Sequence, residues 1–154
     1  MTKDKTLIVN AIENGTVLDH IPSEYLFKVV DILNLASTSN QITIGSNLVS
    51  KSFGSKGIIK IADRYFEDQE INCIALVAPN ATINIIKDYQ VIEKRKISIP
   101  EEVVAVAKCA NPLCITNHQV ISTRFKTIVD NDKIYLLCHY CEKTTKILNL
   151  QPLN

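Results

Sequence analysis

The chain has 154 residues, of which 46% are hydrophobic, and a formal net charge of +1 from 17 basic and 16 acidic side chains. These proportions are ordinary for a globular protein, and the apolar runs are far shorter than the roughly 20 residues that span a bilayer. A membrane-spanning helix is therefore excluded. Nucleic-acid-binding surfaces carry clustered basic residues, whereas the arginines of this chain, Arg64, Arg95 and Arg124, are dispersed. We expect neither a membrane nor a nucleic acid as partner.

The N-terminal residues predict a cytoplasmic protein. Residues 7–9 are apolar but are followed by Asn10, so the apolar stretch of about 7 to 15 residues that marks a secretory signal is not present. Thiols stay reduced in the cytosol. The 5 cysteines therefore favour thiolates that hold a metal ion over disulfides.

The first predicted elements are two strands and a helix. Residues 7–12 and 17–21 are short segments with Ile, Leu and Val, separated by Gly15, which allows a tight turn, and this arrangement is typical of two strands. Pro22 ends the second strand, and Ser23 is placed to cap a helix by accepting a free backbone N–H. Apolar residues then recur with the helical period, which predicts a helix over residues 24–35.

The middle of the chain has the patterns of a hairpin, a second helix and two more strands. Two β-branched runs flank a polar turn that contains glycine, and a helical face of Ile and Ala residues ends before Pro79. The predicted ranges are a hairpin of 42–48 and 57–62, a helix over 69–78, and strands over 81–86 and 89–97.

This order of elements predicts an α+β protein. Strand, helix, strand, strand, helix, strand is the order of a ferredoxin-like β-α-β-β-α-β sandwich, in which two helices cover one face of an antiparallel sheet. We expect this first domain over residues 1–97 and a linker at residues 98–100. Residues 101–154 show short strands and turns without helical periodicity, which predicts a small all-β, zinc-ribbon-like domain that needs a metal to fold.

The last four cysteines form two close pairs. Cys109 and Cys114 have C-x4-C spacing, 23 residues follow, and Cys138 and Cys141 have C-x2-C spacing. Two such knuckles facing each other supply a tetrahedron of thiolates, as in zinc ribbons. Because four thiolates leave no coordination position for water or substrate, we predict one structural Zn²⁺ per chain and no catalytic metal.

The cysteine spacing leaves two alternatives open, iron in place of zinc and four unrelated buried cysteines. A deaminase-type zinc site is not expected, because His118 is followed by Gln119 and Val120 rather than by the H-x-E pattern. We expect His118 and His139 to be surface residues beside the knuckles rather than ligands. Cys73 is expected to be a small buried hydrophobe of the second helix.

Charged residues inside the predicted strands are the second group of candidates. Lys60 interrupts an apolar run, Lys94 lies in the last predicted strand between Glu93 and Arg95, and Asp19 with His20 closes an early strand. Such lysines are usually edge or snorkelling residues. The alternative is anion binding, in which lysines bind phosphate and a carboxylate binds ribose hydroxyls. No glycine-rich phosphate loop is present, so such a site would be built from strand side chains and backbone groups.

Several stretches of the sequence closely resemble the regulatory chain of aspartate carbamoyltransferase. The likeness begins with the run GTVLDHIP before the first helix and ends with the second cysteine knuckle, so it extends over essentially the whole chain. The stretches that carry it are residues 15–22 (GTVLDHIP), 42–48 (ITIGSNL), Lys60-Ile61, 78–82 (APNAT) and 140–143 (YCEK), together with the two knuckles.

This resemblance implies a chain without catalytic activity. Its first domain would bind nucleotide effectors, ATP and CTP with UTP as a further candidate, and its metal domain would dock onto the catalytic chain, whose trimers it joins. It also implies a homodimer of regulatory chains and allosteric control of pyrimidine biosynthesis. Effectors would act by changing the angle between the two domains.

The resemblance also assigns roles to individual residues. The implied nucleotide contacts are base contacts from Ala11, Ile12 and Tyr89, ribose contacts from Asp19 and Lys60, and phosphate contacts from Lys94 and His20. Lys56 and Asn84 match positions near a second nucleotide or phosphate site, and Asn111 and Glu142 match positions that face the catalytic chain. Asn10 and Leu113 depart from the family pattern and bear on effector preference and on docking strength.

Two other functions compete with this interpretation. A zinc ribbon is also a fold of nucleic-acid-binding proteins, although the near-zero net charge and the scarcity of aromatics in the metal domain argue against it. The other alternative is a ligand sensor that has no enzyme partner. Salt-dependent binding to DNA or RNA would support the first alternative. Co-purification with a catalytic subunit would exclude the second.

Overall fold

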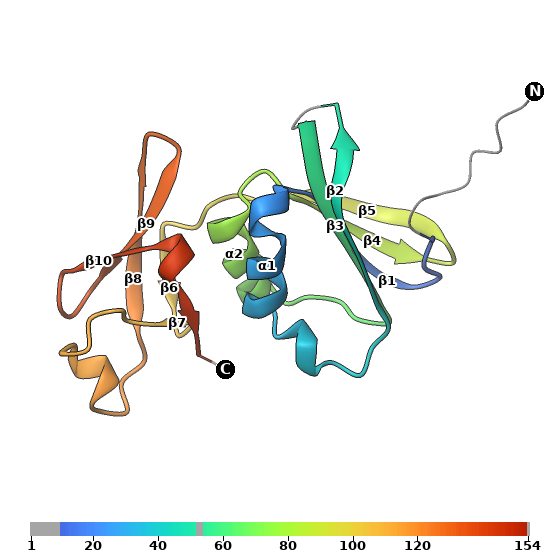
Figure 1. The fold of residues 1–154 in the computed structure, drawn as a ribbon. Coiled ribbons are helices and arrows are strands. Elements are labelled where there is room, and N and C mark those ends of the chain that lie inside the picture. Colours follow the sequence, from blue (N-terminus) through green and yellow to red (C-terminus); the bar gives the residue numbers. More distant parts are fainter. Residues whose placement is uncertain (1–9, 52–53, 154) are drawn as a thin grey trace, which may run out of the picture.

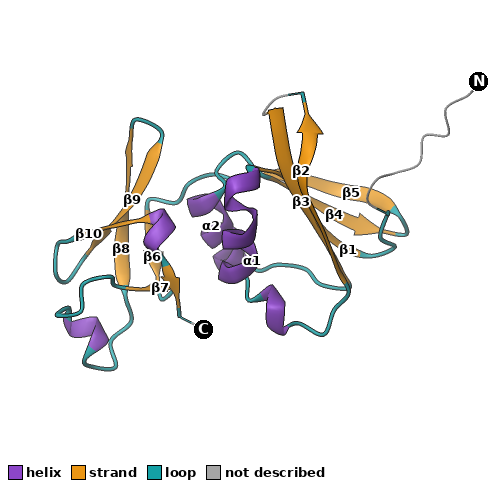
Figure 2. Cartoon of the chain, viewed as in Figure 1, coloured by secondary structure: helices purple, strands orange, loops and turns teal. Residues whose placement is uncertain are grey.

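The computed structural model describes residues 10–51 and 54–153. It has a five-stranded sheet at one end, two helices in the middle and a smaller sheet at the other end (Figure 1). Strands outnumber helices throughout (Figure 2), which confirms the predicted α+β class. Within the described ranges, no helix is long and apolar enough to cross a bilayer.

The larger sheet has the predicted ferredoxin-like order of elements with one more strand at its edge. Its strands lie in the order β2-β3-β1-β4-β5, and every neighbouring pair is antiparallel. The elements in chain order are β1 (Gly15–Ile21), α1 (Leu26–Ile32), β2 (Ile42–Ser50), β3 (Gly54–Ala62), α2 (Asp68–Val77), β4 (Thr82–Lys87) and β5 (Gln90–Lys96).

One face of this sheet is apolar and lies under the two helices. Leu18 is the cross-strand partner of both Ile59 and Ile83, and all three side chains are almost fully buried. They pack in one cluster with Val29 of α1 and Ile74 of α2. Because side chains alternate along a strand, the residues between them lie on the opposite face, which the helices leave uncovered.

The beginning of the chain and the first helix differ from the sequence-based prediction. The predicted strand over 7–12 is wrong for residues 10–12, which have no strand structure, and residues 7–9 lie outside the described residues. Ser23 does not cap α1, because its hydroxyl accepts the backbone N–H of Asn47 at 3.3 Å. The helix also ends early, since Asn34 adopts a left-handed conformation that a short polar side chain tolerates.

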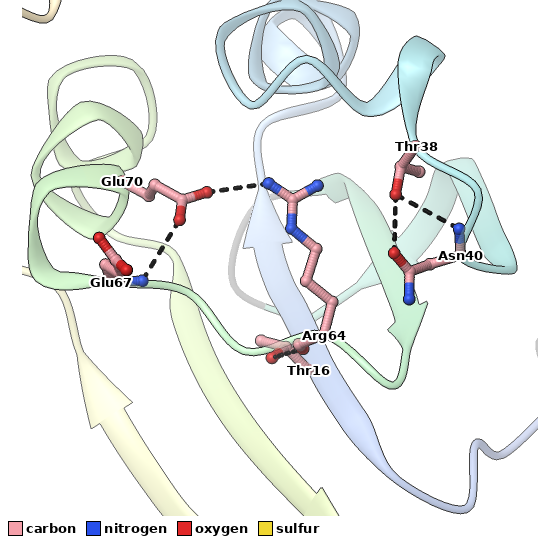
Figure 3. A network of polar contacts seen from close by, with 6 residues as sticks. All are labelled: Thr16, Thr38, Asn40, Arg64, Glu67 and Glu70. Carbon is pink, nitrogen blue, oxygen red and sulfur yellow. Dashed lines mark hydrogen bonds and ion pairs between the residues drawn. The ribbon is translucent and has the colours of Figure 1, made fainter.

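Helix α2 is fixed at its first turn to the neighbouring strands. Glu67 and Glu70 form a reciprocal capping box, which satisfies free backbone N–H groups of the first turn. Glu70 also pairs with Arg64 at 3.0 Å, and the backbone carbonyl of Arg64 accepts the hydroxyl of Thr16 at 2.6 Å (Figure 3). A second pair, Thr38 with Asn40, closes the turn before β2 (Figure 3).

The C-terminal third of the chain is built from short strands. A four-stranded sheet has the order β10-β9-β8-β6, and a two-stranded ribbon pairs β11 with β7. The elements are β6 (Glu102–Val104), β7 (Ala107–Lys108), β8 (Arg124–Asp130), β9 (Lys133–Cys138), β10 (Thr144–Lys146) and β11 (Gln151–Pro152). Phe125 and Leu136 are fully buried in this sheet, which therefore has only a thin core.

The helices join the two sheets. Ile147 and Leu150, which follow β10, belong to the same buried cluster as the residues of α1 and α2. The ammonium group of Lys28 on α1 donates to the carbonyl of Leu150 at 2.5 Å, and the side-chain amide of Gln69 on α2 donates to the carbonyl of Val104 at 3.3 Å. The smaller sheet is thus held against the helix layer by apolar packing and by polar contacts.

Candidate metal centre and polar sheet face

The four predicted cysteine ligands come together. The ligand atoms of Cys109, Cys114, Cys138 and Cys141 all lie within 4.8 Å of one another. The Cys109 and Cys141 sulfurs are 3.6 Å apart, and the Cys114 and Cys138 sulfurs are 3.8 Å apart. A tetrahedron of sulfurs about 2.3 Å from a central ion has edges of about 3.8 Å, so the spacing fits a tetrahedral thiolate site.

Short turns aim the sulfurs of each knuckle. In the first, the backbone N–H of Cys114 donates to the carbonyl of Asn111, and the side-chain amide of Asn117 donates to the carbonyls of Cys109 and Asn111. In the second, Glu142 adopts a left-handed conformation and its N–H returns to the carbonyl of Cys138. The role of Asn117 was not predicted from the sequence, because a side-chain amide that donates to backbone carbonyls belongs to no recognisable sequence motif.

The protonation of the thiols also fits a metal site. Burial raises the pKa of the Cys109 thiol to about 12. For Cys141 burial acts in the same direction, but the backbone N–H of Lys143 and the side chain of Asn111 outweigh it and lower the pKa to about 7. Ionisation of the buried Cys109 thiol is therefore unfavourable in the chain alone, and a bound metal ion would supply the positive charge that favours it.

Neither candidate histidine belongs to the cysteine cluster. Among the described residues, the metal-ligand group at this site contains the four cysteines and no histidine. His118 lies on the surface, with its Nε2 atom 2.7 Å from the carbonyl of Pro112, and His139 is also exposed. Both therefore lie where the sequence predicted, beside the knuckles. Cys73 is partly buried, and burial raises the pKa of its thiol to about 11, which keeps it an unreactive neutral group.

The second group of candidates lies on the uncovered face of the larger sheet. Lys60, Val17, Asn84 and Lys94 occupy one cross-strand row over β3, β1, β4 and β5. Thr43 of β2 extends this row, because it is the register partner of Lys60. We call these residues the polar row. Residues that are distant in sequence thus form one strip across the sheet, which is polar at every position except the buried Val17.

Asn84 lies between Val17 and Lys94 in the polar row, and its side chain has an unsatisfied acceptor. The Oδ1 atom is buried and has no hydrogen-bond partner among the described residues. A buried acceptor without a partner costs about 1 to 3 kcal/mol, so native proteins retain one chiefly where a ligand or water satisfies it. The position therefore points to a donor group from outside the chain.

An ion pair lies beside the polar row. The ammonium of Lys56 is 2.9 Å from the carboxylate of Asp19. Burial would raise the pKa of Asp19, but the hydrogen bond from Lys56 and the backbone N–H of His20, together with the charges of Lys56 and His20, hold it below its ordinary value. The carboxylate is thus ionised at neutral pH. The His20 ring contacts the hydroxyl of Thr82 at 3.1 Å.

Lys60 and the segment before β1 border the same face. The Lys60 ammonium donates to the carbonyl of Asn10 at 2.8 Å. Burial lowers the pKa of Lys60 and the charge of Asp19 opposes this effect. The backbone N–H of Tyr89 donates to the carbonyl of Glu13, which places the Tyr89 turn beside residues Ala11 and Ile12. The Tyr89 carbonyl, rather than its N–H, is therefore the group that a ligand can contact.

The two predicted partner residues flank the metal centre from different knuckles. Asn111 is half-buried, its Oδ1 atom accepts the N–H of Leu113, and Glu142 is exposed. Leu113, which the sequence already singled out, is exposed, and the structure adds two more exposed apolar side chains nearby, Ile115 and Val120. These two could have been noticed in the sequence, since they are apolar residues in a stretch without any periodic element.

Two family models match the chain. The one for the allosteric domain of the aspartate carbamoyltransferase regulatory chain covers residues 7–98, and the one for its metal binding domain covers residues 101–149. The chain belongs to the aspartate carbamoyltransferase regulatory chain family. The polar row lies within the range of the first model, and the four cysteines lie within the range of the second.

Similar regulatory chains occur in bacteria and archaea. Aspartate carbamoyltransferase regulatory chains of Bacteroides fragilis and Parabacteroides distasonis are 53% and 50% identical over 147 and 141 residues, which is 95% and 92% of this chain and 95% and 91% of theirs. That of Thermococcus gammatolerans is 45% identical over 139 residues, 90% of this chain and 91% of its own. The family resemblance read from the sequence is confirmed, and with it a non-catalytic regulatory role.

Proposed function

We propose that this regulatory chain binds nucleotide effectors, ATP, CTP and UTP, on the uncovered face of the larger sheet and transmits their binding to the catalytic chain. The observation that carries the proposal is the polar row, in which Lys60 and Lys94 lie on either side of Asn84, whose buried oxygen has no partner among the described residues. Lysines suit phosphates, and an unsatisfied acceptor suits a hydroxyl or amino donor.

The contacts of the site support a specific orientation of the nucleotide. The base would lie at the turn of Tyr89 near Ala11 and Ile12, where the Tyr89 carbonyl accepts an exocyclic amino group. Asp19 and Lys60 would bind the ribose. Lys94 and His20 would bind the phosphates, while Lys56 and Asn84 would serve a second nucleotide or phosphate position. Adenine and cytosine carry such an amino group, whereas uracil would offer its ring N–H as the donor to the same carbonyl, so this geometry accepts all three bases.

Nucleotide titration of the full chain by calorimetry tests this site. Lys60→Ala and Lys94→Ala should each weaken ATP and CTP binding by about tenfold, because each removes a charge-assisted contact. Lys126→Ala, which removes an exposed lysine of β8 in the smaller sheet, is the matched control and should bind as the parent chain does. If Lys60→Ala and Lys94→Ala both bind nucleotides with unchanged affinity, the two lysines are ordinary surface residues and the proposed site is wrong.

The metal in the thiolate site is proposed to be one structural Zn²⁺ per chain. Four cysteine sulfurs at tetrahedral spacing and no open position are the features of structural zinc sites. The ion would hold the two knuckles together and do no chemistry of its own. Elemental analysis of the purified chain should give one zinc per chain, and a stoichiometric amount of iron would contradict the assignment.

The metal-binding part is proposed to dock onto catalytic trimers through Asn111 and Glu142. Each residue lies beside a different knuckle, so the ion fixes their separation. The proposed domains are residues 1–97 and 101–154. Mixing the full chain with catalytic trimer, with and without chelation, tests the docking, and assembly that persists after verified metal removal would falsify it.

A homodimer of regulatory chains is proposed through the edge of the larger sheet. Strand β2 is an edge strand, and it exposes Ile44 and Val49. Exposed apolar edge strands pair readily with another chain. Sedimentation of the parent chain and of Ile44→Lys tests this contact: the parent should sediment as a dimer and the variant should shift toward the monomer. A monomeric parent chain would contradict the proposal.

A further inference from the structure

A cavity of about 380 Å³ lies between the helix layer and the smaller sheet. It is far from the polar row, because the helices cover the other face of the larger sheet (Figure 1). Its walls come from both parts of the chain, and we call it the helix–sheet cavity. The lining residues include Tyr25, Val77, Lys133, Tyr135, Lys146 and Ile147.

The inner wall of the helix–sheet cavity is apolar. Leu76 and Val77, at the C-terminal end of α2, are almost fully buried, and Ile147 approaches from the segment after β10 with only 8% of its surface exposed. Pro22 and Pro79 complete this side. Because neither proline has a backbone N–H, they add apolar surface without a donor. Such a wall suits a flat apolar group.

The outer wall of the cavity is polar, and its two lysines are exposed to solvent. The ammonium groups of Lys133 and Lys146 take part in no ion pair among the described residues, and the hydroxyls of Tyr25 and Tyr135 have no hydrogen-bond partner there. Lys146 and Tyr135 are direct register partners on β10 and β9. Asp132 also lines the cavity, so its ionisable lining at neutral pH carries one net positive charge.

We propose that the helix–sheet cavity is a second small-molecule site, which takes an aromatic monocarboxylate. The ring would lie against the apolar wall of Val77 and Ile147, and the carboxylate would meet Lys133, Lys146 and the tyrosine hydroxyls. Pockets of this size, mostly apolar with a few convergent polar groups, are typical of small-ligand sites. One negative charge matches the net charge of the lining.

A ligand in this cavity would also act on the arrangement of the chain. Its walls come from α2 on one side and from β9 and β10 on the other, so an occupant contacts both at once. A ligand favours the state to which it binds better. Occupation of the helix–sheet cavity therefore stabilises the present separation of helix layer and smaller sheet, and it is coupled to nucleotide binding to the extent that nucleotides favour a different separation.

The test uses 2-naphthoate and its neutral analogue 2-naphthamide as probes of the zinc-loaded full chain, with binding followed by calorimetry and by NMR. Naphthoate should bind saturably and more tightly than naphthamide. Lys133→Gln with Lys146→Gln should weaken naphthoate binding by about tenfold and leave naphthamide unchanged, since only the charged contacts are lost. Lys126→Gln, a lysine on the same sheet outside the cavity, should behave like the parent chain.

Two further variants fix the location. Asn80→Trp places a bulky ring at an exposed lining position and should abolish binding of both probes, while Lys60→Ala should leave naphthoate binding intact. Unchanged thermal unfolding shows that the variants fold. No saturable naphthoate binding, equal affinity in the double glutamine variant, or loss of binding in Lys60→Ala would overturn the proposal. None of these results depends on whether nucleotides bind the polar row.

Discussion

Asp19 and Lys56 form an ion pair beside the proposed nucleotide site, and its pH dependence can be predicted. Because the folded pKa of Asp19 lies below its unfolded value of about 3.9, the pair contributes stability above that pH and loses it as the pH falls through the folded pKa. Both side chains are partly exposed to solvent, which screens the charges, so the contribution is about 0.5 kcal/mol.

Lys56→Met should therefore raise the pKa of Asp19 toward its ordinary value. Carbon NMR of the Asp19 carboxyl group in parent and variant measures this directly. Any acid-driven loss of metal affects both chains equally and cancels in the comparison. In the variant, burial still acts to raise the pKa of Asp19, and only the backbone N–H and the charge of His20 remain to oppose it. A pKa that does not move would show that Lys56 does not pair with Asp19 in solution.

Gly15 is required at the start of β1. Its φ angle is +137°, and a Cβ atom there would lie 2.1 Å from the carbonyl oxygen of Ile61 on the neighbouring strand. Gly15→Ala should cost about 2 kcal/mol or more, because the strand pair must shift. Gly54→Ala is the matched control: φ is +75°, but no atom lies within 4 Å of the added carbon. Equal losses in urea unfolding would mean that only backbone conformation, and not the clash, matters at Gly15.

At the scale of elements, the smaller sheet should depend on the metal and the larger sheet should not. The sheet of β6, β8, β9 and β10 has a thin core, and structural zinc contributes about 10 to 16 kcal/mol in small finger peptides. Chelation should abolish amide hydrogen-exchange protection in β8 and β9, whereas β1 and β3 should stay protected. Cys114→Ser is expected to have the same effect. Protected β8 and β9 amides after verified metal removal would contradict this prediction.

At the scale of the whole molecule, Lys28 connects the helix layer to the C-terminal ribbon. Its ammonium donates to the carbonyl of Leu150, directly before β11. Lys28→Met keeps most of the apolar stem but loses the charged donor, so amide exchange in the pairing of β7 with β11 should accelerate by about tenfold. Lys126→Met serves as control. Exchange that is unchanged at Gln151, whose register partner is Lys108, would show that Lys28 does not hold the ribbon.

The sequence by itself determined the family, the α+β class, the order of elements in the larger sheet and the four thiol ligands. These features depend on local periodicity and on short spacings, such as the C-x4-C and C-x2-C knuckles, which the chain carries whatever its tertiary contacts are. It also singled out Lys60 and Lys94 as charged residues within strands. It could not decide whether they were ordinary edge residues.

The tertiary structure decided what these residues share. Strand register aligns Lys60, Asn84 and Lys94 in one row and leaves the Asn84 oxygen buried without a partner in the described part of the chain. No local pattern encodes pairing between strands so far apart in sequence. Helix α1 ends at Ile32, before Asn34, which adopts a left-handed conformation. The Ser23 hydroxyl accepts the backbone N–H of Asn47 and does not cap the helix. The helix–sheet cavity likewise exists only because packing brings α2 against β9 and β10.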